Sequence, residues 1–166
     1  GKDSIDRNYL KHHEDIQKTD LLVGKYHYFR TYEDPIEQAK HYLKHTKFTE
    51  SDFRPILDVE YKRKNRHADS LRSDVKKWFD YVEKETGLVG ILYSYRNFHK
   101  EFFMGYPEFD KYPLWIARYT NDCEKIEEVM AYADMLQFTD TLYVKGIEKR
   151  VDGNKATIEK FLRLLP

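Results

Sequence analysis

The chain has 166 residues, 35% of them charged, and its 29 Lys and Arg residues balance its 29 Asp and Glu residues. This length and composition are typical of one folded domain, so we treat residues 1–166 as a single domain. The balanced charge offers no basic surplus for nucleic acid, and no run of about 18 apolar residues is available for a membrane-spanning helix.

Predicted helices and strands alternate along the chain. Apolar spacing and capping residues predict, in order, a loose helix over 4–18, a strand over 21–29, a helix over 35–44 with Asp34 as N-cap, a strand over 54–60, a helix over 70–86 ended by Gly87, a strand over 88–95, a short helix over 97–104, a strand over 114–119, a helix over 124–132, strands over 135–139 and 149–152, and a closing helix over 156–164.

Strands separated by helices predict parallel βαβ units and an α/β fold. An open doubly wound sheet accommodates the six predicted strands, whereas a closed α/β barrel needs about eight. No Gly-rich phosphate loop follows any strand, which disfavours a nucleotide-binding form of the open sheet.

Two carboxylates, Asp58 and Glu60, end the apolar strand over 54–60. Side chains alternate along a strand, so both acids point to one face while Leu57 and Val59 point to the other. Burial and like charge should raise the pKa of at least one of them, as acid-base catalysis requires. The alternative is a strand end whose acids cap loop N–H groups or pair with nearby basic residues.

Two further polar residues lie near strand ends. Asp152 lies at the end of the last strand, where it is either a third active-site acid or part of an Asp-Gly turn. His27 lies in an aromatic strand, where it is either a proton carrier or a hydrogen-bonded core histidine.

Aromatic residues are frequent, with 14 Tyr, 10 Phe and 2 Trp in the chain. Tyr and Trp combine an apolar ring with a polar tip, a combination that suits sugar-binding clefts but also a Tyr-rich core. Metal or thiol chemistry has little support, because His41 and His45 lack a third ligand and Cys123 lacks a partner. We therefore expect no metal and no cofactor.

Seven short motifs resemble the family 25 glycoside hydrolases, the N-acetylmuramidase type of lysozyme, and together they cover nearly the whole chain. In chain order they are Gly24-Lys25-Tyr26-His27-Tyr28-Phe29, Gln38-Ala39, Leu57-Asp58-Val59-Glu60, Leu92-Tyr93-Ser94, the strand from Leu114 to Tyr119, Gln137-Phe138-Thr139 and Val151-Asp152-Gly153-Asn154.

The resemblance implies a TIM-like (β/α)5(β)3 barrel and cleavage of the β-1,4 bond between N-acetylmuramic acid and N-acetylglucosamine. It implies that Glu60 is the general acid and that Asp58 and Asp152 assist, with retention of configuration and a nucleophile that the sequence leaves open. The substrate groove would be lined by Tyr26, His27, Tyr28, Tyr93, Trp115, Tyr119 and Gln137.

The chain departs from the family pattern at its start, because the family's first strand with Asp-x-Ser and second strand with Glu-Gly are absent. We expect those two strands and their Asp to exist in the natural protein, since their loss would expose long sheet edges. Peptidoglycan strands would be the partner of a monomer that is secreted or in the cell envelope, although no signal peptide is visible. The alternatives are a catalytically inactive glycan-binding domain, a different barrel hydrolase such as a chitin-cleaving enzyme, and an interaction domain.

Overall fold

The computed structural model describes residues 1–46, 48 and 52–166, which form a curved β-sheet with most of its helices on the outer face. The elements are α1 (Tyr9–Ile16), β1 (Tyr26–Tyr28), α2 (Pro35–His45), β2 (Ile56–Asp58), α3 (Ala68–Thr86), β3 (Ile91–Tyr95), α4 (Arg96–Phe102), the 3₁₀ helix η1 (Pro107–Phe109), β4 (Leu114–Ala117), α5 (Cys123–Met130), β5 (Met135–Leu142), β6 (Val151–Lys155) and α6 (Ile158–Leu162).

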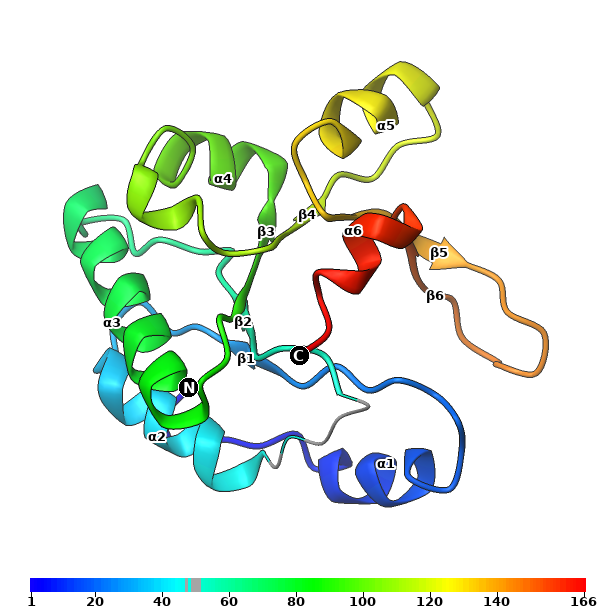
Figure 1. The fold of residues 1–166 in the computed structure, drawn as a ribbon, viewed down its shortest axis with the longest axis horizontal. Coiled ribbons are helices and arrows are strands. Elements are labelled where there is room, and N and C mark those ends of the chain that lie inside the picture. The colour runs from blue at the N-terminus through cyan, green and yellow to red at the C-terminus, as the bar shows by residue number, and fades with distance from the viewer. Residues whose placement is uncertain (47, 49–51) are drawn as a thin grey trace.

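The six strands follow one another in the sheet in chain order, from β1 to β6. Strands β1 to β5 are parallel, whereas β6 returns antiparallel to β5. The predicted α/β class and its six strands are thus confirmed. The sheet curls into half of a barrel, and in Figure 1 the loop joining β5 to β6 extends away from the other elements.

The main core lies between the outer face of the sheet and the helices α2 and α3, which pack against each other. Helix α3 presents a stripe of apolar residues to this core at the predicted helical spacing, and each of them is buried: Leu71, Val75, Trp78, Phe79 and Val82. Leu57 and Val59 of the β2 segment enter the same core, as strand alternation predicts.

Local signals in the sequence account for two helix ends. The carboxylate of Asp34 accepts hydrogen bonds from the backbone N–H groups of Ile36 and Glu37 at 2.8 and 2.9 Å, so α2 begins at the predicted residue. Helix α3 ends at Gly87, whose φ of 72° is a left-handed conformation that favours glycine.

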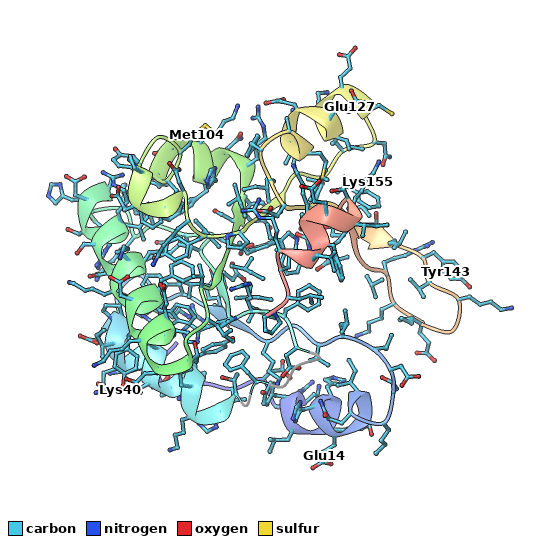
Figure 2. The ribbon with its side chains drawn as sticks, in the orientation of Figure 1. Glu14, Lys40, Met104, Glu127, Tyr143 and Lys155 are labelled. Carbon is cyan, nitrogen blue, oxygen red and sulfur yellow. The ribbon has the colours of Figure 1, made fainter. Side chains whose placement is uncertain are left out.

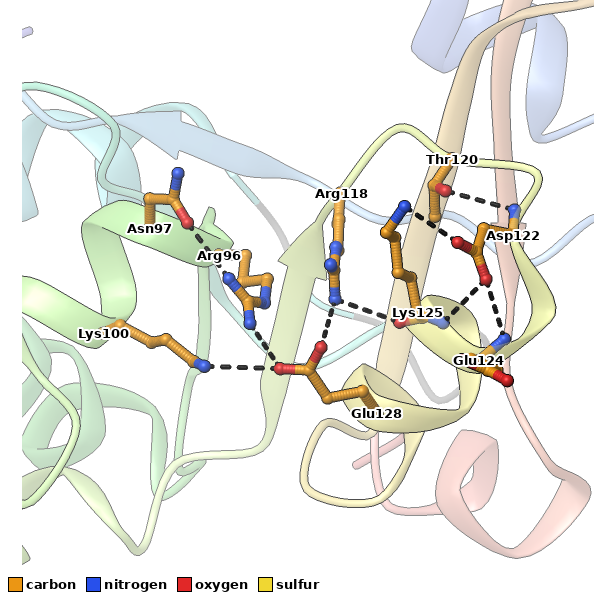
Figure 3. A network of polar contacts seen from close by, with 9 residues as sticks. All are labelled: Arg96, Asn97, Lys100, Arg118, Thr120, Asp122, Glu124, Lys125 and Glu128. Carbon is orange, nitrogen blue, oxygen red and sulfur yellow. Dashed lines mark hydrogen bonds and ion pairs between the residues drawn. The ribbon is translucent and has the colours of Figure 1, made fainter.

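A network of charged residues joins the outer helices α4 and α5 to the end of β4 (Figure 3). The carboxylate of Glu128 accepts hydrogen bonds from Arg96, Lys100 and Arg118, and these cations lower the pKa of Glu128 to about 2. Other charged side chains on the outer helices, including the labelled Glu14, Lys40 and Glu127, point away from the ribbon in Figure 2.

Several element bounds differ from the sequence-based prediction: β1, β2 and α6 are shorter than predicted, and β6 begins and ends later. Three further differences have a clear structural description. Helix α1 is shorter than predicted and buries none of its residues, so its apolar spacing does not reflect a core contact. The 3₁₀ helix η1 was not predicted. Strand β5 continues to Leu142, because its pairing with β6 extends the strand beyond the apolar segment that identified it.

Candidate active site

The inner face of the sheet carries a cleft of about 260 Å³ towards the carboxyl ends of the parallel strands. Below it, the inner face is filled by an apolar cluster in which Leu164, after the last helix, packs with Ile56, Ile91 and Tyr93. The cleft is lined by three carboxylates, six aromatic or apolar side chains and one amide: Asp58, Glu60, Asp152, Tyr26, Ile56, Tyr93, Tyr95, Trp115, Tyr119 and Gln137.

Asp58 and Glu60 share this cleft because they lie two residues apart at the end of β2. Backbone hydrogen bonds hold the segment on both sides: Phe29 N–H donates to the Asp58 carbonyl at 2.9 Å and Val59 N–H donates to the Tyr93 carbonyl at 3.0 Å. The Ser94 hydroxyl also donates to the Val59 carbonyl at 2.7 Å. The orientation of both acids is therefore set by the sheet.

The environment of the two carboxylates favours their protonated forms. Burial, and then the charge of Glu60, raise the pKa of Asp58 from its ordinary value of 3.8 to about 8. Burial also raises the pKa of Glu60, while a hydrogen bond with the Tyr93 hydroxyl acts in the opposite direction. The pair titrates as one coupled unit, and Asp58 is its more deeply buried member.

Asp152 reaches the cleft from β6, which is the edge strand at the other end of the sheet from β1. A side chain at the neighbouring Gly153 would bring its Cβ to 2.8 Å from the Thr139 Cγ2 atom, so β6 passes close to β5 at this point. The charge of Asp152 contributes to the raised pKa values of Tyr26 and Tyr119, after burial in each case. The third carboxylate thus acts on groups that line the same cleft.

Hydrogen bonds and ring contacts fix the positions of the aromatic side chains that form the wall of the cleft. The Tyr93 hydroxyl donates to Gln137 Oε1 at 2.6 Å. The indole N–H of Trp115 donates to Asn154 Oδ1 at 3.0 Å, and the Trp115 and Tyr93 rings meet edge to face with their centroids 5.2 Å apart. These contacts give the wall a defined shape before any ligand binds.

Two residues predicted to line the groove lie outside this cleft. His27 points to the outer face of β1, where its Nε2 atom lies 3.2 Å from Gln38 Oε1 and its ring stacks on Trp78. His27 is therefore a hydrogen-bonded core histidine, the second of the two interpretations that the sequence allows. Tyr28 lines a neighbouring pocket of about 560 Å³ at the β1 edge, under the Arg30 guanidinium. We leave both residues out of the proposed site.

The buried position of His27 makes stability depend on pH. Burial lowers the pKa of His27 from 6.5 to about 4, so the unfolded chain binds a proton that the folded protein does not bind in this range. The free energy of unfolding is therefore expected to decrease as pH falls from 6.5 to 4, by about 2–3 kcal/mol from this residue.

Thermal unfolding of His27→Phe between pH 4 and 7 checks this expectation, because a phenyl ring fits the aromatic contacts without titrating. The variant should show a smaller fall in Tm on acidification than the parent protein, whereas the exposed control His12→Gln should follow the parent. An unchanged slope in His27→Phe would contradict the assignment.

Tyr95 and Ile56 line the cleft but were not among the predicted site residues. Tyr95 ends β3, and its ring meets that of Tyr119 at a centroid distance of 6.2 Å. The signal was present in the sequence, since alternation along the strand places Tyr95 on the same face as Tyr93.

Within the described part of the chain, no group of three or more His, Cys, Asp or Glu side chains is arranged to hold a metal ion. None of the helices described in residues 1–46, 48 and 52–166 has the length and apolar character needed to cross a membrane.

The model of the glycosyl hydrolases family 25 matches residues 1–147 of the chain. The chain belongs to this family. The resemblance inferred from the seven sequence motifs is thus confirmed, and the curved half-barrel sheet is consistent with the family 25 fold.

Solved structures similar to the chain include a family 25 glycosyl hydrolase from Bacillus anthracis, with 21% identity, a TM-score of 0.77, and coverage of 97% of this chain and 76% of that one. A bacterial lysozyme from Streptomyces coelicolor has 16% identity, a TM-score of 0.84, and coverage of 99% and 82%. A family 25 lysozyme from Aspergillus fumigatus has 17% identity, a TM-score of 0.78, and coverage of 99% and 83%. At these identities the likeness shows the fold.

Among curated proteins, the chain is 33% identical over 162 residues to the uncharacterized protein YegX of Escherichia coli (strain K12). The match covers 96% of this chain but 58% of the relative's length. The chain therefore spans little more than half of the curated relatives that it matches.

Proposed function

We propose that this protein is a peptidoglycan hydrolase that cleaves the β-1,4 bond between N-acetylmuramic acid and N-acetylglucosamine. The observation that carries the proposal is the meeting of Asp58, Glu60 and Asp152 in one aromatic-lined cleft. Membership of family 25 and the lysozymes among the structural neighbours support the same activity.

In the proposed mechanism, Glu60 is the general acid that protonates the glycosidic oxygen. Burial raises the pKa of Glu60, which favours the protonated form that this role needs. Loss of the Asp58 proton places a negative charge beside the protonated Glu60 and strengthens the hold of Glu60 on its own proton. The coupled pair holds one proton up to about pH 8, and in the reactive form this proton lies on Glu60. Ionised Asp58 and Asp152 then stabilise the positive charge that develops on the sugar ring.

The cleft also suits a sugar chain as ligand. Trp115, Tyr119 and Tyr26 offer ring faces to the apolar faces of pyranose rings. The Tyr and Gln137 polar groups supply hydrogen bonds to hydroxyl and acetamido groups. Because peptidoglycan lies outside the cytoplasm, we propose that the protein acts in the cell envelope or after secretion.

Analysis of reducing ends released from purified peptidoglycan tests the proposed activity. Muramic acid at the new reducing ends is the expected result, and glucosamine ends would show that a different bond is cut. Sedimentation with insoluble peptidoglycan in the absence of any product would instead support the alternative of an inactive glycan-binding domain.

A further inference from the structure

The indole ring of Trp115 is held at its polar edge by Asn154. The Trp115 Nε1–H group donates to Asn154 Oδ1 at 3.0 Å. An indole N–H can only donate, so the amide must present its oxygen here. Asn154 is not one of the described residues that line the cleft, but it lines a neighbouring hollow of about 290 Å³ together with Met135 and Phe161. An effect of Asn154 on a ligand of the cleft is therefore expected to pass through the Trp115 ring.

The sheet fixes the positions of both partners of this hydrogen bond. Trp115 lies in β4 opposite Tyr93 of β3, and Asn154 lies in β6 opposite Gln137 of β5. Residues directly opposite each other on antiparallel strands have Cβ atoms about 4.5–5.5 Å apart. Gln137 accepts a hydrogen bond from Tyr93 at 2.6 Å, just as Asn154 accepts one from Trp115. Two neighbouring amides thus hold two neighbouring aromatic rings.

The contact with Tyr93 does not fix the Trp115 ring by itself. The planes of the two rings meet at 81°, and their centroids lie 5.2 Å apart. The torsion that turns an aromatic ring about its own side chain has a broad energy minimum, so a ring contact tolerates a range of tilts. A hydrogen bond at Nε1 is directional and selects one tilt from this range. Asn154 and Tyr93 together therefore define the plane of the indole.

The hydrogen bond between Trp115 and Asn154 is exposed in the free protein. Water can replace Asn154 as the acceptor there, so the bond should contribute little to folding stability. A glycan that covers the indole would exclude this water, and the ring would then depend on Asn154 to pair its N–H group. A ring already held in its binding orientation also loses less conformational freedom when the ligand binds. The bond is therefore expected to matter more for binding than for folding.

We propose that Asn154 is a positioning residue that fixes the plane of the Trp115 indole as a platform for a sugar ring of the glycan. The apolar face of a pyranose needs a ring face of defined orientation, and Asn154 supplies that orientation from the adjacent hollow. The inference rests on the proposed function, because it takes a glycan as the ligand of the cleft.

The first test follows the indole N–H signals of the free protein by NMR. The chain has two Trp residues, and Trp78 in the main core is the internal reference. Asn154→Leu removes the acceptor at similar size, so the Trp115 signal should move upfield and its exchange with water should become about two- to tenfold faster. Asn154→Asp keeps an acceptor oxygen, so it should restore the slow exchange. The Trp78 signal should stay in place in both variants.

The second test measures binding of peptide-free glycan strands of peptidoglycan in the Glu60→Gln background, where the ligand is not cut. Adding Asn154→Leu should raise the Kd about two- to tenfold, with little change in Tm. Asn154→Ala, which also lacks the acceptor, replaces this variant if Asn154→Leu does not fold, and the same rise is expected. Asn8→Leu is the matched control, because Asn8 is exposed at the start of α1 and its side chain does not cap that helix. Its Kd should equal that of the background protein.

The third test separates KM from kcat with Glu60 in place. The indole contacts the sugar equally before and during bond cleavage, so Asn154→Leu should raise KM and leave kcat at the parent value. This substitution removes no charge, so Asp152 on the same strand keeps its electrostatic effect.

An unchanged Trp115 signal in folded Asn154→Leu, or an unchanged Kd, would overturn the inference. If the parent protein cuts peptidoglycan while Asn154→Leu binds glycan normally, the inference alone is rejected. If the parent neither binds nor cuts the glycan, the proposed function is rejected together with the ligand assumed here.

Discussion

Glu60→Gln is expected to lower the turnover of peptidoglycan hydrolysis by roughly 10²- to 10⁴-fold, because an amide cannot donate the proton that a general acid supplies. The side chain keeps its shape and lies just beyond the carboxyl end of β2, so the fold and the binding of glycan should persist. Turnover measured by release of reducing ends, with Tm measured in parallel, separates the two effects.

Glu127→Gln is the control for this experiment. Glu127 lies on the exposed face of α5, away from the residues that line the cleft, and Figure 2 shows its side chain pointing outward. The control should retain the turnover of the parent protein. A Glu60→Gln variant that also retained it would remove Glu60 from the acid role.

Asp58→Asn is expected to stabilise the folded protein at pH 8 while lowering its activity. The pKa of Asp58 is about 8 in the folded protein and near 3.8 when the side chain is free of its surroundings. The folded state therefore binds the proton more tightly, and the free energy of unfolding falls as pH rises from about 4 to 8. Asparagine does not ionise, so the variant avoids this loss.

The gain in Asp58→Asn should grow through that pH range to an upper limit of about 5 kcal/mol, and it should vanish below pH 4. Chemical denaturation at pH 4, 6 and 8 measures it. The exposed control Asp110→Asn should show no such growth. A stability difference that is equal at all three pH values would contradict a buried, proton-holding Asp58.

Activity of the same variant tests the coupling between the two acids. Asparagine removes the negative charge that would oppose ionisation of Glu60, so the basic limb of the pH profile of kcat/KM should move to lower pH. An unchanged profile would mean that the two carboxyl groups titrate independently.

The carboxylate pair could be predicted from the sequence because a strand repeats its orientation every second residue. Asp58 and Glu60 meet in the cleft for this reason, and so do Trp115 of β4 and Tyr119, which follows that strand. The same rule would have placed Tyr95 beside Tyr93. Local alternation was therefore sufficient for groups on one strand.

The position of His27 could not be derived from its own strand. Tyr26 lines the cleft, whereas His27 faces α2 and α3. The two residues are adjacent in one sequence motif, but the alternation of side chains along β1 points them to opposite faces of the sheet. Which face of a strand points inward depends on the curvature of the whole sheet and on the partners Gln38 and Trp78, which are distant in the sequence.

Helix α1 shows a further limit of sequence patterns. Its apolar residues have helical spacing, but Leu10 is 70% exposed and no residue of the helix is buried. Periodicity reports the tendency to form a helix and does not identify the surface that the helix will contact.

The pairing of β6 with β5 sets the position of Asp152. This position therefore does not depend on the length of the loop that precedes β6. Gln137 pairs with Asn154 and Thr139 with Gly153, whereas residues 143–150 beyond the paired region are all exposed. Gly146, with a φ of 91°, lies in this loop. A peptide grafted at the tip would thus project from the sheet without displacing Asp152, which makes the loop a natural place to attach an additional wall-binding peptide.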